Sequence, residues 1–269
     1  MERVDALILA RGGSKRIPRK NLVDICGLPL VAWSIIQAKT ARLVDEVWVS
    51  TDDDEIQEVS EKYGARVIRR PEWMMDDKYS GGVPTRHGVR MIKELGEFDA
   101  IMSILPTSPL RMPGAMDRTL EVYRAAPDPE FPVRKSAMGM ARMHDVSKFI
   151  DQGDGTCTVD FIDKTNTALL MAGLIGVQDG QALLDYYDYM QEKYGVIHDT
   201  DERADASYLK GEFDAIEYTR QYFVEMQPWQ IYELDVPEQL PLFRDMMEFH
   251  IMQKGGVELY EKYKQGATE

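Results

Sequence analysis

Strand-like and helix-like segments alternate over residues 6–105, and this alternation is the feature that most narrows the possible folds. Between the strand-like runs, apolar residues recur at the spacing of amphipathic helices. Strands joined by helices form βαβ crossovers, which build a largely parallel sheet. The pattern therefore predicts an α/β fold. The expected strands are residues 6–10, 46–50, 66–68 and 100–105, and the expected helices begin near Pro29, residues 52–54 and Thr85.

The regular alternation loosens after Leu110. The motif PDPEFP predicts a connection, and DQGDGT predicts a hairpin turn ahead of a strand over residues 168–177. Residues 183–215 are rich in Tyr, Asp and Glu, and HDTDERAD predicts an exposed loop there. A final helix over residues 238–253 gathers four apolar side chains on one face, which we interpret as core or interface packing. These side chains are Leu240, Phe243, Met247 and Ile251.

The composition limits the classes of partner. With 269 residues, 44% of them hydrophobic, the chain can bury a substantial core. No apolar run approaches the roughly 18 to 20 residues of a membrane span, and Glu2, Arg3 and Asp5 stand where a signal peptide is apolar, so we expect a cytoplasmic protein. A formal charge of −14 argues against nucleic-acid binding. Cys26 and Cys157 are expected to be reduced thiols.

A compact basic cluster follows the first expected strand, in LILARGGSKRIPRKNL at residues 7–22. So many cations together in an acidic chain indicate an anionic ligand. The loop stands where open α/β sheets bind ligands, and Gly12 and Gly13 allow a backbone to approach a phosphate closely. The spacing fits neither G-x-G-x-x-G nor G-x-x-x-x-G-K-[ST]. The residues alone leave phosphate binding and a solvated basic turn both open.

Two groups of acidic residues invite a metal interpretation. Glu233 and Asp235 are one residue apart on an expected strand, so both carboxylates emerge on one face. Such a pair suits Mg²⁺, which completes its shell with water and phosphate, although a solvated strand edge is the alternative. The consecutive acids of VSTDDDEI, residues 52–54, point in different directions at a helix N-terminus, and we interpret them as capping residues.

Four motifs, LARGGSKRIPRKNL, VSTDDDEI, RRPEWM and PTSPLR, stand in an order that resembles the cytidylyltransferases of acidic nonulosonic sugars. These are the CMP-sialic acid synthetases and their legionaminate and pseudaminate relatives. The resemblance covers roughly residues 4–125, with a further match at YELDVPEQL. It implies a Rossmann-like nucleotide-diphospho-sugar transferase fold with a mixed, mostly parallel sheet. It also implies one domain over residues 1–269, a small dimerisation subdomain near residues 131–225, and a homodimer.

The reaction that the resemblance implies is a Mg²⁺-dependent nucleotidyl transfer. The anomeric hydroxyl of an acidic sugar attacks the α-phosphorus of CTP, and pyrophosphate leaves. Two alternatives stand beside it: the same fold with another nucleotide or acceptor, and a catalytically weak nucleotide-binding scaffold. Leu105 replaces the glutamine of sialate-specific relatives, and residues 165–177 lack the polar groups that the family carries there. These departures indicate a different acceptor.

The resemblance also assigns nucleotide contacts, position by position. Lys20 is the main catalytic candidate, together with Arg11, because a positioned cation offsets charge that develops on the phosphates. The expected nucleotide-binding residues are Ala10, Arg11, Gly12, Ser14, Lys15, Lys20, Asn21 and Arg70.

The same comparison places the metal and the acceptor sugar. Glu233 and Asp235 are expected to hold Mg²⁺, with Glu233 standing where the family usually has aspartate. The expected acceptor contacts are Thr107, Ser108, Arg111 and Lys148. Arg111 is the candidate partner of the sugar carboxylate, since guanidinium and carboxylate pair in a bidentate manner.

Overall fold

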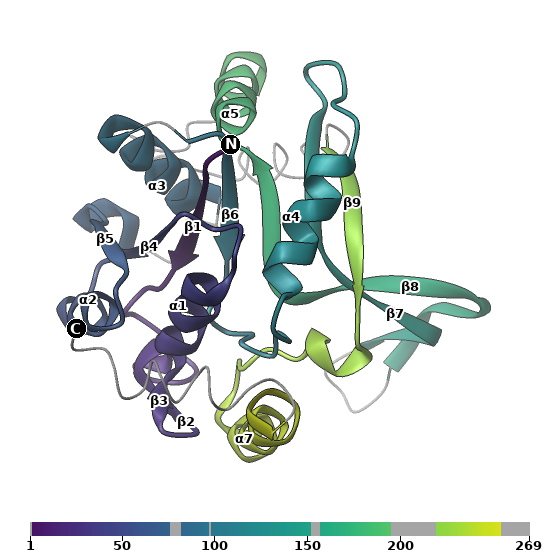
Figure 1. Ribbon diagram of the computed structural model, residues 1–269. Coiled ribbons are helices and arrows are strands. Elements are labelled where there is room, and N and C mark those ends of the chain that lie inside the picture. The colour runs from purple at the N-terminus through teal and green to yellow at the C-terminus, as the bar shows by residue number, and fades with distance from the viewer. Residues whose placement is uncertain (1, 76–81, 97, 152–156, 195–218, 254–269) are drawn as a thin grey trace.

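The computed structural model describes residues 2–75, 82–96, 98–151, 157–194 and 219–253. Its middle layer is a seven-stranded sheet in the order β5-β4-β1-β6-β8-β7-β9 (Figure 1). The first four of these strands run parallel, as the alternation predicted. They are β1 (Val4–Leu9), β4 (Glu46–Thr51), β5 (Arg66–Arg69) and β6 (Ala100–Ile104).

The second part of the sheet contains two long strands. β8 (Cys157–Asp179) is antiparallel to both β6 and β7 (Arg134–Asp151), and β9 (Thr219–Met226) is parallel to β7. The sheet is therefore mixed and mostly parallel. β7 and β8 form a hairpin that extends away from the body of the molecule (Figure 1). The expected strand over residues 168–177 lies within β8, and the turn residues 152–156 lie outside the described residues.

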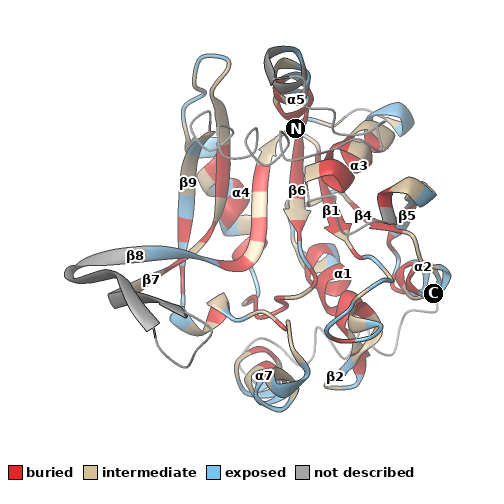
Figure 2. Cartoon of the chain, turned by 180° about the vertical axis from the view of Figure 1, so that it is seen from behind, coloured by how far each residue is buried: buried red, intermediate tan, exposed pale blue. Residues whose placement is uncertain are grey.

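Helices cover both faces of the sheet (Figures 1 and 2). The larger core, on one face, includes side chains of α1 (Leu30–Thr40), α2 (Asp54–Lys62) and α4 (Ala115–Ala125). The smaller core, on the other face, includes α3 (Gly82–Leu95) and α5 (Gly180–Tyr194). Every residue of α1 from 30 to 38 is buried, so this helix is enclosed on all sides. Among the described residues, no helix is long and apolar enough to cross a membrane.

The exposed loop predicted at HDTDERAD, residues 198–205, lies outside the described residues, and the sequence pattern did not predict α5 just ahead of it. Asp179 accepts a hydrogen bond from the backbone N–H of Ala182 at 2.6 Å, and Leu183, Leu184 and Tyr186 are buried. The many Tyr and Asp residues concealed this apolar face in the sequence. Residues 195–215 lie outside the described residues. The proposed subdomain over residues 131–225 includes them, so its dimerising role stays a prediction.

Short elements complete the chain. They are β2 (Asp24–Ile25), β3 (Leu28–Pro29), α7 (Leu240–Met246), the π-helical turn Met247–Met252, and the 3₁₀ turns Lys20–Leu22, Glu72–Met75, Pro228–Ile231 and Pro237–Gln239. Phe243, Met247 and Ile251 of the final helix are buried in the larger core, which confirms the packing interpretation. Cys26 is a free thiol, as expected.

β8 bends sharply before it reaches β6 (Figure 2). Gly173 and Leu174 both have left-handed backbone conformations, with φ of 67° and 44°. Arg111 stabilises the bend, because its guanidinium donates hydrogen bonds to the carbonyls of Gly173 and Leu105. The ordinary β8–β6 ladder begins at Ile175, just after the bend.

We expect Gly173→Ala to lower the free energy of unfolding by about 1 to 2 kcal/mol, because a β-carbon is strained in the left-handed region. The added carbon would also lie 3.2 Å from the sulfur of Met226. Gly176→Ala on the same strand is the matched control. Its φ is not positive and an added β-carbon meets no heavy atom within 4 Å, so we expect a change within about 0.5 kcal/mol. Urea denaturation measures both, and equal losses would contradict the strain at Gly173.

Candidate active site

The basic loop after β1 lies at the carboxyl end of the parallel strands, against the turn between β4 and α2. The backbone N–H of Gly12 donates to Asp52 Oδ1 at 2.9 Å. A β-carbon at Gly12 would lie 2.5 Å from Asp53 Oδ2, so this close approach requires glycine. Ile17 is buried and anchors the middle of the loop in the larger core. The N–H of Gly12, expected to face the nucleotide, therefore contacts a carboxylate in this structure.

Asp53 holds the far end of the same loop through Arg19. Arg19 has a left-handed backbone, φ 56°, and its guanidinium pairs with Asp53 and with Glu55. The hydrogen bond to Asp53 raises the pKa of Arg19. Burial works to raise the pKa of Asp53, but the backbone N–H of Ile56 and Arg19 together hold it below its usual value. Asp53 also caps α2, as expected, and its second role as a clamp on the loop was not predicted.

The basic loop meets the distant acidic pair. Lys20 Nζ donates to Asp235 Oδ1 at 3.1 Å, and the Arg16 guanidinium lies 3.8 Å from the same oxygen. The Lys20 side chain is 15% exposed, so this ion pair is partly shielded from water. The structure thus brings together the residues predicted for phosphate and metal from opposite ends of the chain.

Asn21 lies beside this contact and contributes a buried amide. Its nitrogen donates to the carbonyl of Arg11 at 2.9 Å, which ties the start of the loop to its end. Its Oδ1 atom is buried and has no hydrogen-bond partner among the described residues. A buried oxygen without a donor is costly unless a ligand supplies one. This orphan acceptor therefore points to a bound N–H or O–H group.

Glu233 and Asp235 lie in an extended segment between two 3₁₀ turns, which corrects the expectation that they belong to a strand. The segment is held by isolated bonds. The backbone N–H of Leu234, which is fully buried, donates to the carbonyl of Thr107 at 2.8 Å. Thr107 Oγ1 in turn donates to Glu233 Oε2 at 3.3 Å. The carboxylates on either side of Leu234 therefore lie next to the loop after β6.

The electrostatics of the acidic pair favour a cation. Burial raises the pKa of Glu233, and the negative charge of Asp235 raises it further, while Thr107 and Lys20 act in the opposite direction. The oxygens of these two partly buried carboxylates are hard ligands of the kind that Mg²⁺ prefers. Among the described residues, no group of three or more His, Cys, Asp or Glu side chains forms a complete cage. A metal held here would take its other ligands from water or a phosphate.

Arg70 is partly buried at the end of β5, beside the carboxyl end of β4. Its guanidinium donates to the hydroxyl and to the carbonyl of Ser50, each at 2.9 Å. Burial lowers the pKa of Arg70 to about 10, with a smaller effect from Arg11, so the side chain stays charged at neutral pH. Ser50 also accepts the backbone N–H of Ala10. Arg70 and the start of the basic loop thus meet at one strand end, while Lys15 is exposed and Ser14 is partly exposed.

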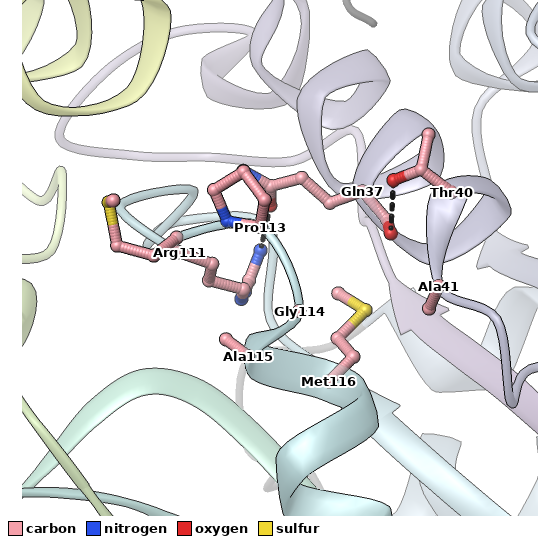
Figure 3. Close-up of a pocket in the computed structure, with 9 residues that line it drawn as sticks. Gln37, Thr40, Ala41, Arg111, Pro113, Gly114, Ala115 and Met116 are labelled. Carbon is pink, nitrogen blue, oxygen red and sulfur yellow. Dashed lines mark hydrogen bonds between the residues drawn. The ribbon is translucent and has the colours of Figure 1, made fainter. Parts of the chain in front are cut away.

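The expected acceptor residues differ in their environments. Arg111 is only 1% exposed, and it donates to Ser34 Oγ and Gln37 Oε1 at 3.0 Å in addition to the two carbonyls at the bend (Figure 3). Arg111 is therefore committed to the fold, which argues against the expected contact with a sugar carboxylate. Ser108 is also buried and donates to the carbonyl of Tyr232. Lys148 lies on β7 opposite Phe161, and its side chain is outside the described residues.

Loss of the Asp53 clamp should loosen the basic loop without unfolding α2. In Asp53→Asn the cap on α2 is retained, because asparagine is as good a capping residue, but the charged contact with Arg19 is weakened. We expect amide hydrogen exchange over residues 12–19 to accelerate about fivefold, the size of a partly exposed ion pair. Asp54→Asn is the matched control, since Asp54 pairs with Arg69 outside the loop. Unchanged exchange in Asp53→Asn would contradict the clamp.

Glu233→Gln should stabilise the protein at alkaline pH when no divalent metal is present. A carboxyl whose pKa is raised by folding destabilises the fold above that raised pKa, and the penalty vanishes below the ordinary glutamate pKa of about 4.3. The gain in unfolding free energy should therefore be absent below that ordinary pKa and grow as the pH rises through the raised pKa of Glu233. Urea denaturation across this range measures it, with the exposed Glu238→Gln as the control. A gain that is independent of pH would contradict this origin.

Known proteins resemble this chain in sequence and in fold. Residues 6–80 match the family model described as cytidylyltransferase. N-acylneuraminate cytidylyltransferase B of Danio rerio is 41% identical over 116 residues, which cover 43% of this chain and 26% of that protein. The pseudaminic acid cytidylyltransferase of Campylobacter jejuni subsp. jejuni is 34% identical over 140 residues, 48% of this chain and 60% of that protein. The aligned part of the chain thus spans between a quarter and three fifths of these relatives.

The likeness in fold extends further than the likeness in sequence. The structure of a CMP:2-keto-3-deoxy-manno-octonic acid synthetase complexed with CTP superimposes with a TM-score of 0.64 at 19% identity, covering 92% of this chain and 99% of that chain. At this identity the match establishes the fold alone. The expected nucleotidyltransferase fold is confirmed, and residues 6–80 are similar in sequence to the cytidylyltransferases that the N-terminal motifs indicated.

Proposed function

We propose that the protein transfers CMP from CTP to an acidic sugar of the nonulosonic or ulosonic class and releases pyrophosphate. The observation that carries the proposal is the contact of Lys20 with Asp235, which joins a phosphate-type basic loop to a carboxylate pair. Relatives named N-acylneuraminate cytidylyltransferase and pseudaminic acid cytidylyltransferase are 41% and 34% identical to this chain over 116 and 140 residues, and the basic loop lies within the matched family model. The solved neighbour complexed with CTP supports the choice of nucleotide.

The chemistry requires positive charge around the phosphates. The anomeric hydroxyl gives its proton to solvent as its oxygen forms a bond to the α-phosphorus. The bond between the α-phosphorus and the bridging oxygen breaks, and pyrophosphate departs with the negative charge. Lys20 is partly shielded from water, so its ammonium acts strongly on the charge that develops there. Arg11, Ser14 and Lys15 stand on the accessible side of the same loop.

Recognition of the nucleoside falls to the partly buried Arg70 and the buried Asn21. Arg70 is fixed by Ser50 near both Asp52 and Arg11, so its guanidinium is already oriented toward the strand end where an anionic ligand would bind. The orphan Oδ1 of Asn21 accepts a hydrogen bond from an N–H or O–H of the ligand. Both groups are oriented before the ligand arrives, which lowers the entropy cost of binding.

Mg²⁺ is part of the proposal. Glu233 and Asp235 would hold it, since the two carboxylates lie close together, and burial and then the charge of Asp235 raise the pKa of Glu233. When bound, Mg²⁺ neutralises phosphate oxygens and aids the departure of pyrophosphate. The protein's own contribution is to keep the two carboxylates beside Thr107 and Lys20.

We also propose a homodimer in the cytoplasm, where nucleoside triphosphates are available. The support for a dimer is a group of large apolar side chains on the long strands that face water in the single chain. They are Leu169, Leu170 and Met171 on β8 and Phe223 on β9. Exposed apolar groups of this kind are typical of protein interfaces.

The test is pyrophosphate release in the presence of Mg²⁺, with CTP, GTP, UTP or ATP and a panel of ulosonic and nonulosonic acids. We expect release with CTP and one class of acid, and mass spectrometry identifies the CMP-sugar. Lys20→Met and Asp235→Asn should each lower kcat by about 100-fold or more, the scale for loss of one group that stabilises the transition state. Lys39→Met, an exposed lysine at the end of α1, is the matched control.

Two results would contradict the proposal. Full activity of both Lys20→Met and Asp235→Asn would show that the contact between them does not mark the reacting centre. Binding of CTP without pyrophosphate release from any acid would favour the nucleotide-binding scaffold instead.

A further inference from the structure

An apolar pocket of about 170 Å³ opens between β6, β7 and β8. Its walls are made by Leu105, Met138, Met171 and Leu174. Leu105 and Met171 stand at the mouth, where they are 40% and 57% exposed. No charged side chain is among the described residues that line it. The pocket therefore suits an uncharged, mainly apolar group.

The floor of the pocket consists of a glycine and a serine. Gly176 of β8 is paired directly with Ser103 of β6 and with Met138 of β7, so the three positions share one face of the sheet. A β-carbon at Gly176 would meet no heavy atom within 4 Å, which shows that the hollow reaches the backbone. Ser103 Oγ is buried and has no hydrogen-bond partner among the described residues. This hydroxyl oxygen therefore lies beneath the surface of the floor, and the surface that a ligand would meet is apolar.

The pocket adjoins the candidate active site through the loop after β6. Leu105 is two residues before Thr107, which contacts Glu233, and two residues span at most about 7 Å. The bend at Gly173 and Leu174 forms the wall on the other side, and Arg111 fixes both walls through the carbonyls of Leu105 and Gly173. Arg111 therefore shapes the pocket by holding its walls. It does not line the pocket itself.

We propose that this pocket selects the acceptor by an acyl substituent longer than acetyl. The alkyl part would pack against Leu105, Met138 and Met171. The volume supports a group of this size, since an apolar cavity of about 150 Å³ holds a benzene ring. A polyhydroxylated chain would lose its hydrogen bonds to water in such surroundings. The inference rests on the proposed function, because it assigns the pocket to the acceptor of that reaction.

The test compares two acceptors that differ only in chain length, the N-acetyl and N-butanoyl forms of one nonulosonic acid. Each buried methylene is worth about fourfold in kcat/KM, so the butanoyl form should be favoured about fifteenfold. Gly176→Val fills the hollow, and valine suits a strand. In this variant the ratio of kcat/KM for the butanoyl form to kcat/KM for the acetyl form should fall to about one or below. Gly96→Val is the matched control, because its added carbon makes only ordinary contact with Arg3, far from the pocket.

Two more variants separate packing from hydrogen bonding. Met171→Gln replaces an exposed part of the wall by a polar group of similar size and should lower the preference severalfold. Ser103→Ala removes a hydroxyl that the pocket surface does not expose, so it should leave the ratio of the two acyl forms unchanged. A ratio of one in the parent protein, or a ratio that survives Gly176→Val, would overturn the proposal.

Calorimetric titration with each acceptor separates the failure of this inference from that of the proposed function. Tighter binding of the butanoyl form that Gly176→Val abolishes, with no pyrophosphate release, would support the pocket and contradict the proposed reaction. Pyrophosphate release at equal kcat/KM for both forms would support the reaction and overturn the pocket. If Gly176→Val instead alters the sedimentation mass and not the ratio, a second copy of the chain fills the hollow and the proposal is wrong.

Discussion

The parallel pairing of β1 between β4 and β6 is the constraint on which the rest of the site depends. β1 is buried on both faces, and its register matches Leu9 with Ser50 and Ile8 with Ile104. Three strands therefore end at one edge of the sheet, and the loops that follow them emerge together. The carboxyl ends of parallel strands form a common edge. This edge makes neighbours of the basic loop, the acids of the β4–α2 turn and Thr107.

Paired charges dominate that edge. Asp52 and Asp53 hold the two ends of the basic loop, and Asp235 holds Lys20 at its exit. These acids offset the repulsion between the cations that the chain gathers in one loop. The offset is largest where burial reduces the screening of charges by water. A triphosphate would meet cations that are already placed, and would compete with Asp235 for Lys20.

The sheet changes character at the β6–β8 junction, and the acceptor pocket arises there. Antiparallel pairing begins at Ile175, immediately after a bend that two left-handed residues create. The bend opens space above Gly176, and Arg111 holds it with four hydrogen-bonded partners. The likeness in sequence to the family model ends at residue 80, whereas the likeness in fold covers 92% of the chain. Nucleotide and acceptor sites thus lie in parts of the chain with different degrees of similarity to relatives.

The sequence by itself determined the parallel half of the sheet, its helices, the capping by Asp53 and the nucleotidyltransferase likeness, because periodicity, caps and motifs are local signals. Tertiary structure decided the rest. α5 was hidden by a polar composition. The acidic pair is extended but is not a strand, since one isolated backbone hydrogen bond, from Leu234 to Thr107, joins the segment to the loop after β6 in place of a ladder. Three contacts join segments that are distant in the sequence. They are the clamp of Asp53 on Arg19, the contact of Lys20 with Asp235 across 215 positions, and the hydrogen bonds of the buried Arg111. No local pattern encodes such contacts, because they depend on which strand ends the sheet brings together.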